Sequence, residues 1–317
     1  MRQTLAAALG DGRLPHAILL EGDEGTGRKT LALLLAQALV CTSGQKPCGV
    51  CTPCKKAAGG IHPDITVVEA KGKAGMITVD VVRAVREWFY VRPNEAGYKI
   101  CILPDAGRMN AHAQNALLKI LEEPPAYGVF VLTVLSASQL LETVLSRVSS
   151  FTLLPPSRAE CVGVLRTLLP QADPARIDYA AGVFDGNIGK ALRLVQDEAF
   201  GRQIAFSLDF CRAIVSPNEY DLLALTGKIE KDRELMKLFL PIAVNILRDV
   251  VSLKTGAGVY VTAEETQLRE IAERLRLDQA LQAVEILGRA QAALQSNANG
   301  PLLATWLCAS LKRAACS

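Results

Sequence analysis

The sequence lacks long hydrophobic runs: no apolar stretch reaches the roughly 18 residues that a membrane-spanning helix needs. It also lacks a strong charge, because its formal net charge at pH 7 is only +3 over 317 residues. So small a charge permits an anionic partner without demanding one. Near the N-terminus, Asp11 interrupts the chain before the apolar core of a secretion signal could form. These absences predict a cytoplasmic protein without a membrane partner, whose first helix lies in residues 1–10.

Histidine is scarce, and His16, His62 and His112 show no metal-ligand spacing with one another. We therefore assign them no chemistry. The nine cysteines are odd in number and unevenly placed, which argues against a disulfide framework. In a reducing cytoplasm they indicate one metal site together with inert core thiols. The thiols outside the cluster described next are scattered, mostly among apolar neighbours: Cys101, Cys161, Cys211, Cys308 and Cys316.

Cys41, Cys48, Cys51 and Cys54 form a cluster in which the last three repeat every third residue. Thiolates at this spacing can close on one Zn²⁺ ion, which prefers four tetrahedral ligands. Four thiolates leave no open coordination position, so the ion would be structural and not catalytic. The alternative is a loop with four unrelated cysteines. We predict a structural zinc site.

Apolar runs alternate with amphipathic segments as far as about residue 154. Continuous apolar strands that alternate with helices predict a parallel sheet with helices on both faces. The predicted strands are Ala17–Leu20, Ile65–Val68, Ile100–Leu103, Val129–Val134 and Phe151–Leu154. The predicted helices are Lys29–Leu39, Val79–Tyr90, Ala111–Glu122 (capped by Asn110) and Ser138–Val144.

Pro155 and Pro156 end this pattern, and no further strand of the same kind follows. We predict an α/β domain over residues 1–154, a small helical domain over 155–200 and a second helical domain over 201–317. Ser157 is expected to cap the first helix of the small domain. The predicted helices after the break include Arg158–Leu169, Pro174–Phe184, Ile188–Asp197, Leu235–Leu253 and Leu281–Leu294.

The segment Glu21–Thr30 has the strand, glycine loop and helix of a phosphate-binding loop. A working loop needs Lys followed by Ser or Thr, for phosphate and Mg²⁺ respectively, but Arg28 and Lys29 occupy these positions. We favour a loop kept as structure over a working nucleotide site. The residues of this altered loop are Gly22, Gly25, Gly27, Arg28, Lys29 and Thr30.

The acid that would bind Mg²⁺ is also altered. Pro104 stands where the first acid is expected after the third strand, and Asp105 remains as a lone carboxylate. Ser146 and Arg147 end the predicted helix after the fourth strand. An arginine at a helix end can reach a phosphate on a neighbouring subunit, although such residues are more often solvated surface charges.

The long motif Ala113–Pro125 closely resembles the signature of bacterial clamp-loader subunits of the AAA+ superfamily. The resemblance runs from about residue 14 to 194. It implies an AAA+ core, a helical lid, a helical collar for oligomerisation and an inserted zinc module. Further similar pieces are Arg92-Pro93, Lys99, Arg108-Met109 and Leu140–Arg147.

The resemblance also implies roles for single residues. The family's serine-arginine-cysteine motif falls on Ser146, Arg147 and Val148, so Arg147 would be an arginine finger that acts in trans on a neighbour's ATP. The lid arginine that senses nucleotide falls on Gly189. Altered phosphate lysine, Mg²⁺ acid and lid arginine together are similar to δ′-type subunits and depart from the motor subunits γ/τ.

The leading hypothesis is therefore a non-catalytic clamp-loader subunit of the DNA polymerase III holoenzyme. Its expected partners are γ/τ and δ subunits, with the sliding clamp and primed DNA reached through the assembled ring; Zn²⁺ is expected and ATP is not. The rival is an active ATPase that uses Arg28 or Lys29 on phosphates and Asp105 on Mg²⁺. A zinc-containing nucleic-acid binder is a weaker third, because the cluster has lysines without interleaved aromatics.

Some polar residues on the predicted helices are candidate contacts within the ring. Arg83, Arg86 and Arg108 are candidates for DNA backbone phosphates, although solvated helix faces are the simpler interpretation of each. On the helix of the long motif, the candidates for a neighbouring subunit are Gln114, Asn115 and Lys119.

Overall fold

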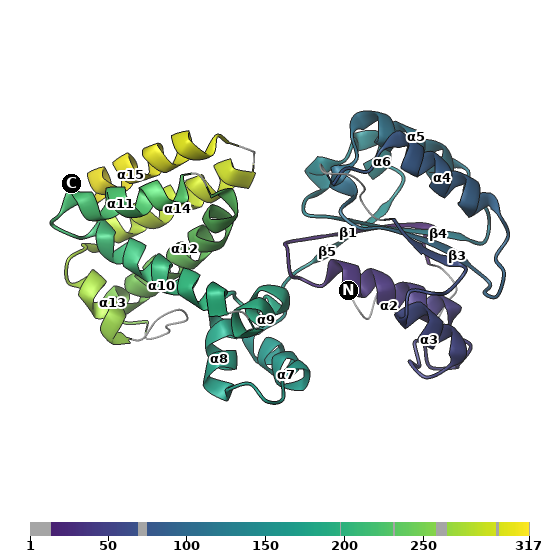
Figure 1. Ribbon diagram of the computed structural model, residues 1–317, viewed down its shortest axis with the longest axis horizontal. Coiled ribbons are helices and arrows are strands. Elements are labelled where there is room, and N and C mark those ends of the chain that lie inside the picture. Colours follow the sequence, from purple (N-terminus) through teal and green to yellow (C-terminus); the bar gives the residue numbers. More distant parts are fainter. Residues whose placement is uncertain are drawn as a thin grey trace. The chain divides into compact units, whose positions relative to one another are not determined.

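The computed structural model describes residues 14–68, 75–196, 198–230, 232–257, 265–295 and 298–316 (Figure 1). The helix predicted for residues 1–10 lies outside these ranges. The chain forms two compact units, Met1–Leu154 and Pro155–Ser317, each described by itself below. None of the helices in the described ranges is long and apolar enough to cross a membrane.

The first unit is built on a five-stranded sheet in the order β2-β3-β4-β1-β5. All neighbouring strands run parallel, as predicted. Each predicted strand is present, with ends that differ by one or two residues. The strands are β1 (Ala17–Gly22), β2 (Ile65–Val67), β3 (Lys99–Leu103), β4 (Gly128–Val134) and β5 (Ser149–Leu153).

Helices cover both faces of this sheet (Figure 1). Side chains alternate along a strand, so Leu19 of β1 packs with the helices on one face while Ile18 packs with those on the other. Both side chains are fully buried, which explains why the strands have continuous apolar sequences. The first face carries α4 (Val79–Tyr90), α5 (Ala111–Glu122) and α6 (Glu142–Leu145), and the second carries α2 (Arg28–Val40) and α3 (Thr52–Ala58).

The single helix predicted over Ser138–Val144 is wrong. The structure has a 3₁₀ turn, η2 (Ala137–Gln139), followed by the one-turn helix α6. Between them Leu140 is extended and buried. The backbone N–H of Leu141 donates to the Gln114 side chain at 2.8 Å, so this group is satisfied by tertiary structure and not by a continuous helix. A second 3₁₀ turn, η1 (Ala106–Arg108), follows β3.

In its described residues the second unit contains helices and no strands. It has one continuous hydrophobic core, which includes Cys161 near its start and Leu311 near its end. Ser157 caps α7, as predicted, in a capping box with Glu160. The division into lid and collar domains at residue 200 stays a prediction. The helices are α7 (Arg158–Leu168), α8 (Pro174–Val183), α9 (Ile188–Gln196), α10 (Glu198–Ile214), α11 (Glu219–Ile229), α12 (Arg233–Thr255), α13 (Glu265–Ala272), α14 (Leu277–Gln295) and α15 (Gly300–Cys316).

Candidate functional site

The altered phosphate-binding loop joins β1 to α2 through three glycines with separate roles. A side chain at Gly22 would lie 2.6 Å from the carbonyl oxygen of Leu153 in β5, so the strand end leaves no room for one. Gly25 and Gly27 both have φ of 85°, in the left-handed region that favours glycine. Gly27 directly precedes α2. The glycines are therefore required by the turn itself, whether or not the loop binds a ligand.

Arg28, in the position of the phosphate lysine, is paired with Asp105. The Arg28 side chain is only 10% exposed, and its Nη2 lies 3.6 Å from Asp105 Oδ1. Burial lowers the pKa of Arg28 and Asp105 opposes this, so the guanidinium stays charged. Lys29 and Thr30 are exposed. The structure thus brings together the two groups that a working site would use on phosphate and Mg²⁺, but as partners of each other.

Arg147 lies on the wall of a cavity of about 620 Å³. Its Nη1 donates to the carbonyl oxygen of Thr143 at 2.7 Å and contacts Ser146 Oγ at 3.1 Å, and its Nη2 lies 2.6 Å from Glu122 Oε1. The short helix α6 places it there, because Ser146 ends that helix and Arg147 follows at once. The cavity is lined by His16, Leu121, Glu122, Ser146, Arg147, Val148 and Ser149.

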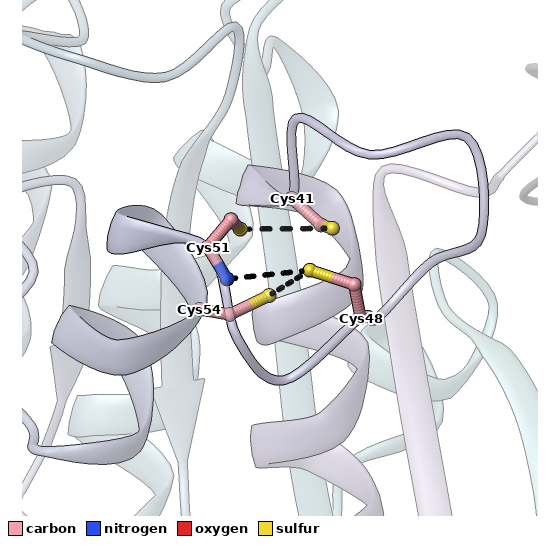
Figure 2. A group of neighbouring side chains, drawn as sticks. All are labelled: Cys41, Cys48, Cys51 and Cys54. Atoms are coloured by element: carbon pink, nitrogen blue, oxygen red, sulfur yellow. Dashed lines mark hydrogen bonds between the residues drawn. The ribbon is translucent and has the colours of Figure 1, made fainter.

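Figure 2 shows the cysteine cluster, in which the ligand atoms of Cys41, Cys48, Cys51 and Cys54 all lie within 4.8 Å of one another. The sulfurs of Cys48 and Cys54 are 3.9 Å apart, as are those of Cys41 and Cys51. A tetrahedral zinc site with Zn–S bonds of about 2.3 Å has sulfurs about 3.8 Å apart. The residues therefore fit the predicted ion, and all four cysteines that the sequence selected are brought together.

Local structure holds the cysteines in place. Cys41 directly follows α2 and Cys51 directly precedes α3, so two helix ends carry the cluster. Gly49, with φ of 74°, makes the turn between Cys48 and Cys51. The backbone N–H of Cys51 also points at Cys48 Sγ, 3.4 Å away, as expected for an acceptor that becomes a thiolate. The module is thus a short connection closed on itself between two helices.

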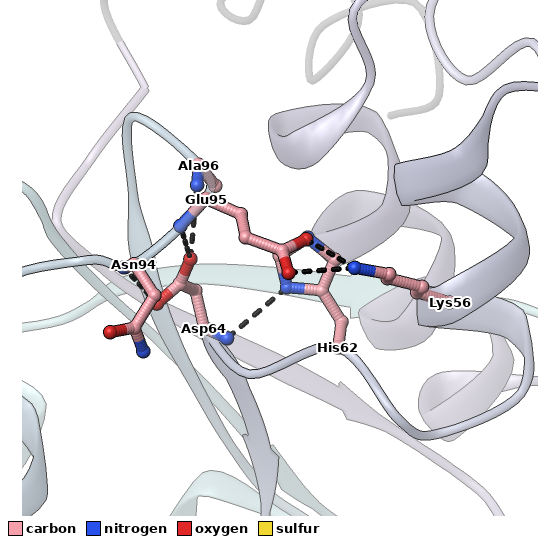
Figure 3. A network of polar contacts seen from close by, with 6 residues as sticks. All are labelled: Lys56, His62, Asp64, Asn94, Glu95 and Ala96. Atoms are coloured by element: carbon pink, nitrogen blue, oxygen red, sulfur yellow. Dashed lines mark hydrogen bonds and ion pairs between the residues drawn. The ribbon is translucent and has the colours of Figure 1, made fainter.

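A buried polar network at the β2 edge of the sheet ties the loop before β3 to the core (Figure 3). The carboxylate of Asp64, which is fully buried, accepts backbone N–H bonds of 2.7, 2.7 and 2.9 Å from residues 94, 95 and 96. Lys99 Nζ lies 3.6 Å from the same carboxylate and 4.4 Å from the centre of the Trp88 ring. Lys56 of α3 pairs with Glu95 at 2.6 Å, which joins the cysteine module to this loop.

We expect Asp64→Asn to lower the free energy of unfolding at pH 7 by about 3 kcal/mol, because it leaves the buried Lys99 charge unpaired. Burial raises the pKa of Asp64, but the three backbone N–H groups and Lys99 outweigh it and hold the pKa below its ordinary 3.8. The ionised carboxylate therefore stabilises the fold above pH 3.8, and this contribution is lost as the pH falls through the lowered pKa.

Urea unfolding between pH 7 and pH 2.5 would measure this effect. Asp64→Asn has no carboxylate to protonate at this position. Its free energy of unfolding should therefore fall less between pH 7 and pH 2.5 than that of the wild type. Asp80→Asn is the matched control, because Asp80 forms an exposed pair with Arg83 and its loss should change little. Equal stability of the Asp64 and Asp80 variants at pH 7 would contradict the prediction.

The polar residues of α5 have different outcomes. Asn110 caps the helix as predicted, since its side chain accepts from the backbone N–H of Ala113 at 2.9 Å. Gln114 is 4% exposed and its amide nitrogen donates to the carbonyl oxygens of residues 109 and 139, so its predicted contact with a neighbouring subunit is wrong. Asn115 and Lys119 are exposed. Their subunit contacts stay predictions.

Of the predicted DNA contacts, Arg83 is exposed and Arg86 is half-buried. Arg108 is exposed, and its Nε lies 3.9 Å from Asp105 Oδ2. These contacts stay predictions as well.

His62 is buried, and so are Cys101, Cys161 and Cys211, which are core thiols as predicted. Burial lowers the pKa of His62, whose Nδ1 accepts the backbone N–H of Asp64 at 3.1 Å. This buried histidine is therefore neutral and structural. Burial raises the pKa of the Cys101, Cys161 and Cys211 thiols, which favours the unreactive protonated form. Cys308 is half-buried on α15.

Comparison with known proteins decides the family. The family described as "DNA polymerase III, delta subunit" matches residues 1–157. The chain is 30% identical to DNA polymerase III subunit delta' of Yersinia pestis over 260 residues, which cover 80% of this chain and 75% of the relative. The chain belongs to the delta' (δ′) family of DNA polymerase III subunits. The δ′ subunit of Escherichia coli is 33% identical over 225 residues, 70% of this chain and 67% of that relative.

This chain is also similar in sequence to a second kind of subunit. DNA polymerase III subunit tau of Bacillus subtilis is 25% identical over 319 residues, which cover 90% of this chain and 55% of the relative. The chain thus resembles both kinds of subunit over most of its length. At Arg28 and Lys29 this chain has neither the Lys nor the Ser or Thr of a standard phosphate-binding loop.

Nothing in the sequence itself marks Glu122 or Asp64 as a partner in an ion pair. Glu122 lies in the long motif, but only the structure shows that it pairs with Arg147. Asp64 follows a proline and precedes β2, and the sequence alone suggests a turn residue. The available signal was Lys99, a charged residue at the start of an apolar strand, which needs a buried partner.

Proposed function

We propose that this δ′ family member is a non-catalytic subunit that completes a clamp-loader ring. In this proposal Arg147 acts in trans on ATP held by an adjacent γ/τ subunit, and the ring, which also contains δ, opens the sliding clamp and places it on primed DNA. The observation that carries the proposal is the half-exposed Arg147 guanidinium beside an open cavity. An arginine so placed can stabilise charge that develops on a transferred phosphoryl group.

The altered loop supports the non-catalytic part of the proposal. Arg28 is paired with Asp105, so a phosphate bound there would have to compete with the half-exposed Asp105 carboxylate for the buried guanidinium. Lys29 has no oxygen with which to bind Mg²⁺. In α9, Gly189 stands where the resemblance places the nucleotide-sensing arginine and offers no charge. Each change removes a different contact to Mg-ATP.

The zinc proposed for the cysteine module has a structural role. Cys41, Cys48, Cys51 and Cys54 would all be ligands, so the ion would leave no position for substrate. Its contribution would be to hold the segment between α2 and α3 in one conformation. The third interpretation, a zinc-dependent nucleic-acid binder, gains nothing from the structure, because the module's described side chains include no aromatic for stacking on bases.

ATP binding distinguishes the proposal from the rival, an active ATPase. We expect the isolated chain to bind no labelled ATP in equilibrium dialysis, with or without Mg²⁺, and to contain one equivalent of zinc. A γ/τ subunit assayed in parallel provides the positive control. Tight Mg²⁺-dependent binding to this chain would favour the rival, with Arg28 or Lys29 on phosphates and Asp105 on Mg²⁺.

The same preparation should co-elute with γ/τ and δ in gel filtration. The cytoplasm remains the expected compartment.

A further inference from the structure

Arg147 is folded back onto its own subunit. Its Nη1 donates to the Thr143 carbonyl oxygen and contacts Ser146 Oγ, both within its own turn of chain. Its Nη2 makes the one contact in this set that reaches another element, at 2.6 Å from Glu122 Oε1 at the end of α5. This contact directs the guanidinium towards the end of α5.

We propose that Glu122 is a positioning residue for Arg147: it holds the finger folded back until a neighbour's phosphate displaces it. The inference rests on the proposed function of Arg147. A phosphate and a carboxylate accept the same pair of guanidinium N–H groups, so the two acceptors compete for Arg147. Arg147 is therefore released from Glu122 when the free subunit takes its place beside the neighbour's ATP in the ring.

The solvent exposure of the two side chains limits the strength of the Glu122–Arg147 ion pair. The Arg147 and Glu122 side chains are 34% and 46% exposed. Ion pairs this exposed to water are worth at most about fivefold in an equilibrium constant. A neighbouring triphosphate, which carries more charge and sits in a closed interface, can overcome such a pair. Glu122 thus restrains the finger without blocking it.

The adjacent Glu123 provides a matched control. It is exposed, carries the same charge and ends α5 together with Glu122, but the ion pair with Arg147 is made by Glu122. Glu122→Gln and Glu123→Gln change the net charge equally. Glu122→Asp adds a second test, because it keeps the charge but draws the carboxylate back by one methylene.

The first experiment uses the isolated full-length chain. Phenylglyoxal modifies accessible guanidinium groups, and peptide mass spectrometry follows Arg147 alone. We expect Glu122→Gln and Glu122→Asp to speed its modification about threefold, the size of effect that a half-exposed ion pair allows. Glu123→Gln should match the wild type. High salt should speed the wild-type reaction towards that of Glu122→Gln, because salt screens exposed pairs.

The second experiment uses the reconstituted ring. If Glu122 competes with the neighbour's phosphate, Glu122→Gln should lower the KM for ATP at the site that Arg147 faces about two- to fivefold and leave kcat nearly unchanged. Equal phenylglyoxal rates for Glu122→Gln and Glu123→Gln, or a fall in kcat with Glu122→Gln, would overturn the inference.

The two experiments separate failure of the inference from failure of the proposed function. If Arg147→Ala leaves the ring's ATP hydrolysis unchanged, the finger role fails, whatever the modification rates show. If Arg147→Ala impairs hydrolysis but Glu122→Gln leaves the modification rate unchanged, the finger role stands and Glu122 does not position it. Thermal unfolding of each variant checks that the fold is intact.

Discussion

Replacing Arg147 with alanine is expected to slow ATP hydrolysis by about 10³-fold or more at the neighbouring site that it faces, the range over which arginine fingers act. Assembly of the ring should be intact, because Arg147 is a half-exposed residue whose partners Glu122, Thr143 and Ser146 are themselves exposed. The loss should appear mainly in kcat, with a smaller rise in KM, because the guanidinium already contacts the bound phosphate and binds the charge that develops in the transition state more strongly.

The measurement has to isolate one site. A ring with several γ/τ subunits keeps the sites that Arg147 does not face, so steady-state DNA-stimulated hydrolysis falls only by the share of the affected site. Single-turnover hydrolysis resolves this: one phase should become about 10³-fold slower while the others persist. Clamp loading on primed DNA should fall in parallel.

Two variants serve as controls for Arg147→Ala. Arg147→Lys keeps the charge but loses the planar fork, so it should recover only part of the rate. Arg166→Ala removes an arginine from another exposed ion pair, with Asp178 at 3.5 Å, and should hydrolyse ATP normally. Normal hydrolysis and clamp loading by the Arg147→Ala ring would contradict the proposed function.

The three inner strands of the sheet, β3, β4 and β1, could be predicted because they are buried on both faces. Runs such as Ala17–Leu20 cannot be anything but strand or core helix, and their length and alternation with helices decide for strand. The single helix predicted over Ser138–Val144 is wrong because a tertiary contact overrides the local pattern. The Ser138–Val144 segment has helical composition, but Leu140 is buried in an extended conformation and Leu141 is hydrogen-bonded to Gln114, a residue of another element. The pattern of neighbouring residues in the sequence does not reveal this hydrogen bond to a distant element.

The candidate site also has a part that the sequence predicts and a part that it does not. The four cysteines lie close in sequence, so their spacing alone predicts their proximity. The pairs Arg28–Asp105, Glu122–Arg147 and Asp64–Lys99 join residues from separate elements, and only the topology of the sheet brings them together. Charge type indicated that such residues needed partners, but it did not say which.

Zinc removal is the second large effect expected. Cys48→Ser should reduce the zinc content from one equivalent to near zero, because a structural site with three thiolates and a weak hydroxyl no longer suits the ion. Structural zinc contributes about 10 kcal/mol or more to small folds that depend on it. Here the sheet has its own core, so the effect should be confined to the module: α3 should lose protection from hydrogen exchange while β1 and β4 keep theirs.

Cys308→Ser provides the control for Cys48→Ser, because Cys308 is a half-buried thiol on α15, in the other unit. It should leave the zinc content and the exchange of α3 unchanged. Acidification should mimic the cluster variant, since protonation of thiolates releases zinc. Full zinc content in Cys48→Ser, or α3 protection that is unchanged when the metal is chelated, would contradict the structural zinc site. Because Lys56 of α3 pairs with Glu95, loss of the metal should also loosen the loop before β3, and hydrogen exchange of residues 94–96 tests that coupling directly.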